Sequence, residues 1–284
     1  MPSIRHIALL CGIAGILSAQ PAKTDAPRKV AFLIAPGAVM IDFTGPWEVF
    51  QDVDMAGSTM DNRKGAFELF TVAESASPIR VSGGMQIVPD YTFQNAPQPD
   101  IIVVPALHTS KPMLQWLRTA SRKAELTMSV CAGAFAMAEA GLLEGKPATI
   151  HHMFFDGFAA RFPKVELKRG VRFVDAGQVA SAAGLTSGID LALHVVERFH
   201  GRDVAAKTAD MLEHESLSWQ NPEQTMDARW LRAGTPSGGQ VDVVCGMNIP
   251  AETKITLSHR GKTYHFCSEQ CKRSFSESPG QFVK

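Results

Sequence analysis

Four short apolar runs separated by helical patterns constrain the fold of this chain most strongly. The runs occupy residues 30–35, 67–72, 101–105 and 126–130. The run at 30–35 is continuous rather than alternating, which is typical of a strand buried on both faces of a parallel sheet, and the other three runs are similar. Helical patterns follow at 46–53, 113–123, 134–140 and 188–199. Strand alternating with helix predicts an α/β fold, a doubly wound parallel sheet covered by helices.

The strand and helix pattern stops near residue 216. The segment 217–240 carries several prolines and glycines and no sustained hydrophobic period, which is typical of a linker. From Val241 the chain changes to closely spaced cysteines, histidines and aromatic residues. A chain of 284 residues with 45% hydrophobic content can hold a large and a small domain. We therefore predict an α/β domain at 28–216 and a small module at 241–284.

The N-terminal residues have the pattern of a secretory signal. Arg5 and His6 precede the apolar run 7–17, which is followed by small residues. This run is too short to span a bilayer core of roughly 30 Å. We expect cleavage of residues 1–19, a periplasmic or secreted protein and no stable membrane insertion. A retained anchor helix and a lipid-modified Cys11 are the alternatives.

Charge and cysteine distribution limit the classes of partner. Lysine plus arginine equals aspartate plus glutamate, 28 against 28, and no helix-turn-helix pattern follows the α/β part. We therefore expect no nucleic-acid partner, but a small-molecule substrate or a metal donor or acceptor. Of the four cysteines beyond the signal, Cys131 stands alone and the others lie within 245–271. This distribution favours one functional thiol and one metal site over paired disulfides.

Cys131 stands where an apolar strand passes directly into an alanine-rich helix. The residues after it, Ala132 and Gly133, are small enough for the backbone to fold back, as in a nucleophile elbow. A helix N-terminus favours the thiolate, so we expect the pKa of Cys131 to lie below the free value of about 8.5. The N–H groups of Ala132 and Gly133 could then hold an oxyanion. The alternative is a buried structural cysteine.

Asp42 is the candidate proton partner of Cys131. It follows the first strand-to-helix connection, just before Thr44-Gly45. Both Asp42 and Cys131 are then predicted at the carboxyl ends of strands, where open α/β folds bind their ligands. A helix-capping role for Asp42 is the alternative.

Several motifs of the α/β part occur together in a recognisable order. They are Asp42-Phe-Thr-Gly-Pro-Trp-Glu-Val-Phe, Ser129-Val-Cys-Ala-Gly-Ala, Ala148-Thr-Ile-His and Ala183-Gly-Leu-Thr-Ser-Gly-Ile-Asp. They resemble the DJ-1/PfpI family over about 28–215, in particular its isonitrile hydratases and the amidase-like half of certain AraC-type regulators. The resemblance implies a flavodoxin-like, class I glutamine amidotransferase-like sandwich, often a homodimer. It also implies Cys131 as nucleophile, Asp42 as proton carrier, and His151 in a structural or substrate-site role.

Two departures from that family bear on its chemistry. Ala132 follows the cysteine, where isonitrile hydratases carry threonine and the protease-like and deglycase-like members carry histidine. Pro105-Ala106-Leu107-His108 replaces the usual Pro-Gly-Gly, and its bulk would reshape the site. We expect a hydratase or hydrolase acting on a small electrophilic carbon. The alternative is a non-catalytic metal-handling or redox stress protein that uses the α/β domain as a scaffold or sensor.

Three cysteines dominate the C-terminal module. Cys267 and Cys271 are four residues apart and would share one face of a helix, while Cys245 lies in a tight Cys-Gly turn. Three thiolates select Cu(I) or Zn(II). Because about forty residues form little core, metal binding would also stabilise the module. A disulfide between Cys267 and Cys271 is the alternative.

The same segment resembles a YHS domain, related to the TRASH-type modules of heavy-metal handling. A fourth ligand stays open: Met247 would favour Cu(I), whereas His265 or His259 would favour Zn(II). The aromatic residues are expected to form the core of a small α+β module. They are Tyr264, Phe266, Phe275 and Phe282.

Overall fold

The structure is a computed structural model of the chain. It describes residues 26–53, 65–221, 240–244, 248–249, 253–267, 269–277 and 279–283. The expected signal at 1–19, most of the expected linker, and Cys245 and Met247 lie outside the described residues. Among the helices described, none has the length and apolar character needed to cross a bilayer.

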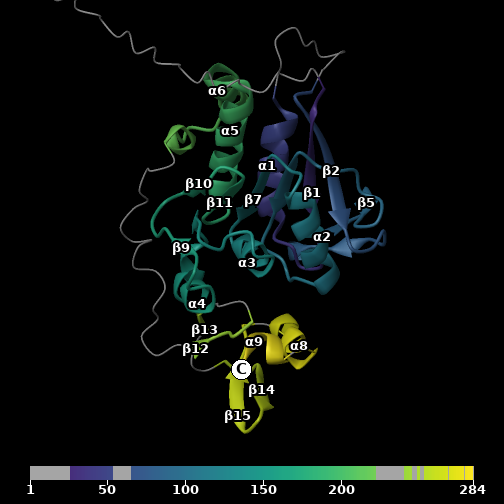
Figure 1. Cartoon of the computed structure of the whole chain (residues 1–284), viewed down its shortest axis with the longest axis vertical. Coiled ribbons are helices and arrows are strands. Elements are labelled where there is room, and N and C mark those ends of the chain that lie inside the picture. Colours follow the sequence, from purple (N-terminus) through teal and green to yellow (C-terminus); the bar gives the residue numbers. More distant parts are fainter. Residues whose placement is uncertain are drawn as a thin grey trace, which may run out of the picture.

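A seven-stranded, mostly parallel sheet forms the centre of the α/β domain (Figure 1), as the sequence predicted. Its order is β10-β11-β7-β6-β1-β2-β5. The strands are β1 (Arg28–Leu33), β2 (Phe67–Ala73), β5 (Tyr91–Thr92), β6 (Ile101–Val104), β7 (Leu126–Val130), β10 (Phe173–Asp175) and β11 (Val179–Ala182). Only β10 runs antiparallel, against β11. The four apolar runs are β1, β2, β6 and β7, and β6 and β7 are buried throughout because both faces of the sheet are covered.

Six α-helices complete the described part of this domain. They are α1 (Met40–Gln51), α2 (Lys111–Ser121), α3 (Gly133–Glu139), α4 (Phe155–Arg161), α5 (Ser187–His200) and α6 (Arg202–Met211). Helix α1 packs against α5, and α2 against α3. Short 3-10 turns occur at η1 (Ser82–Gly84), η2 (His152–Phe154) and η3 (Ser218–Gln220), and small strand pairs are β3 (Ile79–Arg80) with β4 (Gln86–Ile87) and β8 (Pro147–Ala148) with β9 (Glu166–Leu167).

Helix α1 begins earlier than the Gly-Pro pair predicted. It starts at Met40, whose N–H donates to Ser82 Oγ at 2.9 Å, and it keeps Pro46 inside. The cap comes from a residue distant in sequence, which a local pattern cannot show. The earlier start places Asp42 in the first turn of α1. Packing also extends beyond residue 216, because Trp219 is buried in the large core.

The C-terminal module combines two antiparallel strand pairs with two helices. The pairs are β12 (Gln240–Val241) with β13 (Asn248–Ile249) and β14 (Thr256–His259) with β15 (Lys262–His265), followed by α8 (Glu269–Glu277) and α9 (Pro279–Phe282). Its buried core consists of Val244, Phe266, Cys271 and Phe275, with Tyr264 and Phe282 packed against it. This confirms the predicted aromatic core. Figure 1 shows the module beneath α3 and α4.

Candidate nucleophile and metal site

The sharp turn predicted at Cys131 is present. Cys131 follows β7 directly with a φ of 58°, in the left-handed region that a non-glycine residue enters at a cost of about 1–3 kcal/mol. Its N–H donates to the carbonyl oxygen of Ala183 at 2.9 Å, which ties the turn to the residues after β11. Cys131 is 6% exposed. The strained backbone therefore holds this thiol at the carboxyl end of a central strand.

Gly133 is required by the close approach of two backbones. A Cβ at this position would lie 2.1 Å from the carbonyl oxygen of Val104 and 2.8 Å from that of Pro105. Both contacts are with backbone, which cannot rotate away. The elbow therefore needs glycine here for packing.

We expect Gly133→Ala to lower the free energy of unfolding by about 3 kcal/mol, because α3 must move away from β6. Urea unfolding of the two proteins measures this difference. Gly280→Ala is the matched control, since a Cβ there meets nothing within 4 Å. An equal loss in both variants would contradict the packing argument.

Asp42 is fully buried and lies beside Cys131. Its Oδ2 accepts a hydrogen bond from the N–H of Ala106 at 3.1 Å. Val39, the residue that precedes α1, forms no side-chain cap bond. Oδ1 has no hydrogen-bond partner among the described residues, and the carboxyl group as a whole interacts with the Cys131 thiol. Burial raises the pKa of Asp42 to about 7, although the hydrogen bonds from the Ala106 N–H and the Cys131 thiol lower it. The structure thus brings together the two residues expected to share a proton.

The expectation of a lowered pKa at Cys131 is wrong for the resting protein. Burial, followed by the negative charge of Asp42, raises the pKa of Cys131 to about 12. The N–H groups of Ala132 and Leu185 lower the pKa of the thiol without reversing that rise. At neutral pH the pair therefore keeps a proton on sulfur, with Asp42 as its acceptor. A thiolate forms when the proton moves to the carboxylate.

Leu185 is a site residue that sequence reasoning missed. Its N–H, with that of Ala132, donates to the sulfur of Cys131, whereas no contact between Gly133 N–H and the sulfur is recorded in the described residues. The backbone at Leu185 has a φ of 29°, so this segment is also strained. The motif Ala183-Gly-Leu-Thr contained the only sequence signal for it. The oxyanion role expected for Ala132 and Gly133 stays a prediction.

His151 supports the segment that contacts the sulfur. A Cβ on Gly184 would lie 2.6 Å from His151 Cδ2, so the imidazole packs directly on that glycine. Its Nδ1 accepts the N–H of Met153 at 3.3 Å, and its ring lies 4.2 Å from that of His152. Burial, with a smaller effect of His152, lowers the pKa of His151 to about 4. A neutral His151 that packs behind Gly184 favours the structural role.

Cys267, Cys271 and Asp242 form a cluster that could hold one metal ion. Their ligand atoms all lie within 4.8 Å of one another, and the two sulfurs are 3.6 Å apart. Tetrahedral Zn–S bonds of about 2.3 Å place two sulfurs roughly 3.7 Å apart, so the separation fits a shared ion. No disulfide joins Cys267 and Cys271, which was the alternative to a metal site. Cys267 precedes α8 and only Cys271 lies in it, so the sulfurs converge without sharing a helix face.

Asp242 is the ligand candidate that the sequence did not reveal. It is buried, its Oδ1 accepts the N–H of Val244 at 2.9 Å, and its Oδ2 accepts the N–H of Cys267 at 2.7 Å. Burial raises the pKa of Asp242 to about 6, although these two hydrogen bonds lower it. A carboxylate oxygen has a second lone pair, so the same group can hold the backbone and still bind an ion. Its place three residues before Cys245 was the available sequence signal.

The histidines considered as fourth ligands do not join this cluster. His259 packs edge-on against Phe275, with ring centroids 5.8 Å apart. His265 is also outside the group of ligand atoms found among the described residues. The donor set that is present, two sulfurs and one carboxylate, fits the soft or borderline ion expected from the sequence. Cys245, outside the described residues, stays the predicted third thiolate.

Comparison with known proteins identifies both parts of the chain. Residues 28–198 match the DJ-1/PfpI family. The chain belongs to the DJ-1/PfpI family. Residues 241–284 match the YHS domain, so this DJ-1/PfpI protein carries a second, C-terminal unit of known type.

Relatives of this DJ-1/PfpI protein include enzymes and regulators. An isonitrile hydratase of Pseudomonas putida is 29% identical over 192 residues, covering 66% of this chain and 78% of that protein. The HTH-type transcriptional regulator GbdR of Pseudomonas aeruginosa is 24% identical over 265 residues, covering 90% of this chain and 70% of that protein. A 43-residue stretch is 42% identical to part of a copper-transporting P-type ATPase of Rhizobium leguminosarum bv. viciae, covering 15% of this chain and 5% of that protein.

A solved structure supports the same fold. The THiJ/PfpI family protein from Pseudomonas syringae superposes with a TM-score of 0.60 at 23% identity, covering 77% of this chain and 92% of that one. At this identity the likeness concerns the fold alone.

The loop that departs from the family pattern interacts with both sites. Ala106 N–H holds the carboxylate of Asp42, while two residues later His108 lies within electrostatic range of Cys267 and Arg273 in the YHS module. Burial lowers the pKa of His108, even though Cys267 and Glu139 oppose this. This loop therefore binds the proton acceptor of the nucleophile through Ala106 and interacts with the YHS module through His108.

Proposed function

We propose that the α/β domain is a cysteine-dependent hydratase or hydrolase that acts on a small electrophilic carbon. The observation that carries this proposal is the buried Asp42 carboxyl beside the Cys131 thiol, on a strained turn. Cys131 is the nucleophile and Asp42 carries its proton. The relationship to an isonitrile hydratase supports an isonitrile as the first substrate to test.

The proposed reaction adds water to the isonitrile carbon in two stages. Asp42 accepts the thiol proton as Cys131 Sγ bonds to the terminal carbon, and then returns that proton to the carbon to give a thioimidate. Water adds to this carbon, the C–S bond breaks, and the sulfur regains a proton. The sum is one isonitrile plus one water giving one N-substituted formamide. The N–H groups of Ala132 and Leu185 stabilise the sulfur while it is negative.

The pH dependence of this site follows from the pair of groups. Below about 7 both Asp42 and Cys131 are protonated and no base is present; above it Asp42 is ionised and can accept the thiol proton. We expect alkylation of Cys131 by iodoacetamide to speed up with a midpoint near pH 7. Mass spectrometry of the peptide that contains Cys131 measures the rate. In Asp42→Asn this step should disappear, and a midpoint near 8.5 in both proteins would refute the pairing.

We propose that the YHS module binds one Cu(I) or Zn(II) ion through Cys267 and Cys271, with Asp242 as an oxygen ligand. Similarity to part of a copper-transporting ATPase supports copper, whereas a carboxylate ligand supports zinc. Titration of the reduced chain with each ion under native mass spectrometry tests binding and selectivity. We further propose export after cleavage of residues 1–19, which N-terminal sequencing of the mature protein tests.

A non-catalytic role in metal handling is the second candidate. The observation in its favour is that Ala132 stands where isonitrile hydratases carry threonine, so the α/β domain lacks one hydroxyl of their site. In that case the isonitrile assay yields no formamide, while the module still binds its ion.

A further inference from the structure

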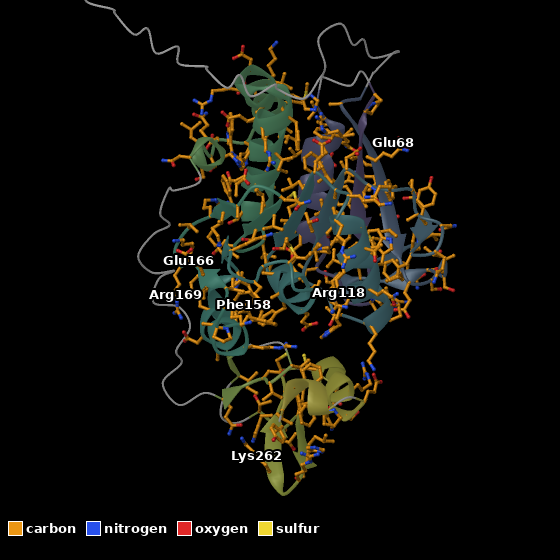
Figure 2. All side chains as sticks on the ribbon, viewed as in Figure 1. Glu68, Arg118, Phe158, Glu166, Arg169 and Lys262 are labelled. Atoms are coloured by element: carbon orange, nitrogen blue, oxygen red, sulfur yellow. The ribbon has the colours of Figure 1, made fainter. Side chains whose placement is uncertain are left out.

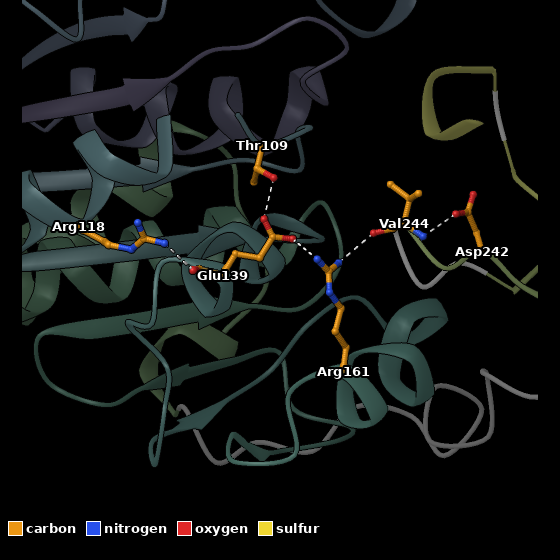
Figure 3. Close-up of polar contacts among 6 residues, drawn as sticks. All are labelled: Thr109, Arg118, Glu139, Arg161, Asp242 and Val244. Carbon is orange, nitrogen blue, oxygen red and sulfur yellow. Dashed lines mark hydrogen bonds and ion pairs between the residues drawn. The ribbon is translucent and has the colours of Figure 1, made fainter. Parts of the chain in front are cut away.

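Arg161 joins the two units of the protein with a single side chain. It ends α4, and its Nη1 donates to the carbonyl oxygen of Val244 in the module at 2.9 Å (Figure 3). Its Nη2 pairs with Glu139 Oε1 at 2.6 Å, and its guanidinium lies 5.5 Å from the ring centroid of Phe282. The side chains of Arg161 and Glu139 are 22% and 11% exposed. Solvent therefore screens this pair less than an ordinary surface ion pair.

On the module side, Arg161 holds the segment that carries the proposed ligands. The Val244 N–H donates to Asp242 Oδ1, and Asp242 Oδ2 accepts from Cys267 N–H. The carbonyl bound by Arg161 is thus two hydrogen bonds from a ligand cysteine. The module has a small core among its described residues, so a bound ion would fix this segment and the Val244 carbonyl.

On the α/β side, Glu139 connects Arg161 to the surroundings of the nucleophile. Glu139 is the last residue of α3, the helix that follows Cys131. Its Oε2 accepts the hydroxyl of Thr109 at 2.7 Å. Thr109 lies in the loop whose Ala106 N–H holds Asp42. Glu139 therefore links α3, the helix after the nucleophile, to Arg161 and to the loop that orients Asp42.

We propose that the α3–α4 face is a docking surface for the metal-loaded YHS module, and that Arg161 couples metal binding to the reactivity of Cys131. This proposal rests on the proposed metal binding but not on turnover. With the ion bound, the Val244 carbonyl holds Arg161 against Glu139, and the Thr109 loop keeps Asp42 in place. Without the ion, this support loosens and Asp42 accepts the thiol proton less readily. Arg161 is a positioning residue.

The test compares the alkylation rate of Cys131 in the full chain with and without Zn(II). Tryptic cleavage after Lys123 and Arg161, or after Lys164 in Arg161→Met, isolates Cys131 from the module cysteines, so its rate is read separately. We expect Zn(II) to raise this rate at least about fivefold over the EDTA-treated protein, the lower end of typical coupling between sites. In Arg161→Met the effect of Zn(II) should vanish, while the zinc-free rate and the zinc stoichiometry stay unchanged.

The control is Arg169→Met. Arg169 pairs with Asp156 at 2.7 Å and lies over Phe155, but has no recorded contact with the described part of the module (Figure 2). This variant should keep the full zinc effect. If Arg161→Met does not fold, Glu139→Gln removes the same ion pair with a side chain of nearly equal size.

The outcomes separate the two proposals. Bound zinc with an unchanged Cys131 rate overturns the coupling alone. Absence of bound zinc and Cu(I) overturns both the metal proposal and the coupling. A zinc effect that persists in Arg161→Met or Glu139→Gln overturns the role of this bridge.

Discussion

Cys131→Ser is expected to reduce the hydration of a small isonitrile by at least about 10³-fold, because it removes the sulfur that forms the covalent bond. Asp42→Asn should cost about 10²- to 10⁴-fold, the usual contribution of a positioned proton carrier. Formation of the N-substituted formamide, followed by liquid chromatography and mass spectrometry, measures both effects. A thioimidate adduct on Cys131 should accumulate if the second stage limits the rate.

Ser129→Ala is the matched control for these variants. Ser129 is buried on β7 two residues before Cys131, and its hydroxyl makes no hydrogen bond in the described residues. Its removal should change the rate less than about twofold. Turnover that survives Cys131→Ser undiminished would exclude a covalent bond through sulfur as the route.

Cys271→Ser is expected to abolish metal binding and to unfold the YHS module. Cys271 is 1% exposed and belongs both to the ligand cluster and to the module core. Structural zinc supplies about 10–16 kcal/mol of apparent binding free energy in small zinc-finger domains, more than a forty-residue core provides. Native mass spectrometry should show the loss of one ion, and hydrogen exchange over 253–283 should show loss of protection.

Cys131→Ser is the control for this second experiment, since it makes the same chemical change in the other unit. It should keep one ion and the protection of the module. Retention of the ion by Cys271→Ser would contradict the ligand assignment. A disulfide between Cys267 and Cys271 in the full chain under metal-replete conditions without reductant would favour the disulfide over the metal site.

The sequence predicted the elements that depend on local patterns. Largely apolar runs identified β1, β2, β6 and β7, because strands buried on both faces carry few polar residues. The small residues Ala132 and Gly133 directly after Cys131 identified the elbow, because they let the backbone fold back. Both inferences needed only neighbouring residues.

The sequence was misleading where burial and distant neighbours decide the chemistry. A helix N-terminus suggested an acidic thiol, but desolvation and the charge of Asp42 raise the pKa of Cys131 instead. The start of α1 also depended on the distant hydroxyl of Ser82. No local pattern records how deeply a group is buried or which residue from another element faces it.

The residues alone determined that the chain has an α/β domain with a turn cysteine and a second module with paired cysteines. Tertiary structure decided what those cysteines face. It placed Asp42 beside Cys131, brought Asp242 to Cys267, and set Arg161 between the units. Hydrophobic periodicity can be read directly from the sequence. The partner of a polar side chain is determined only when folding brings distant segments together.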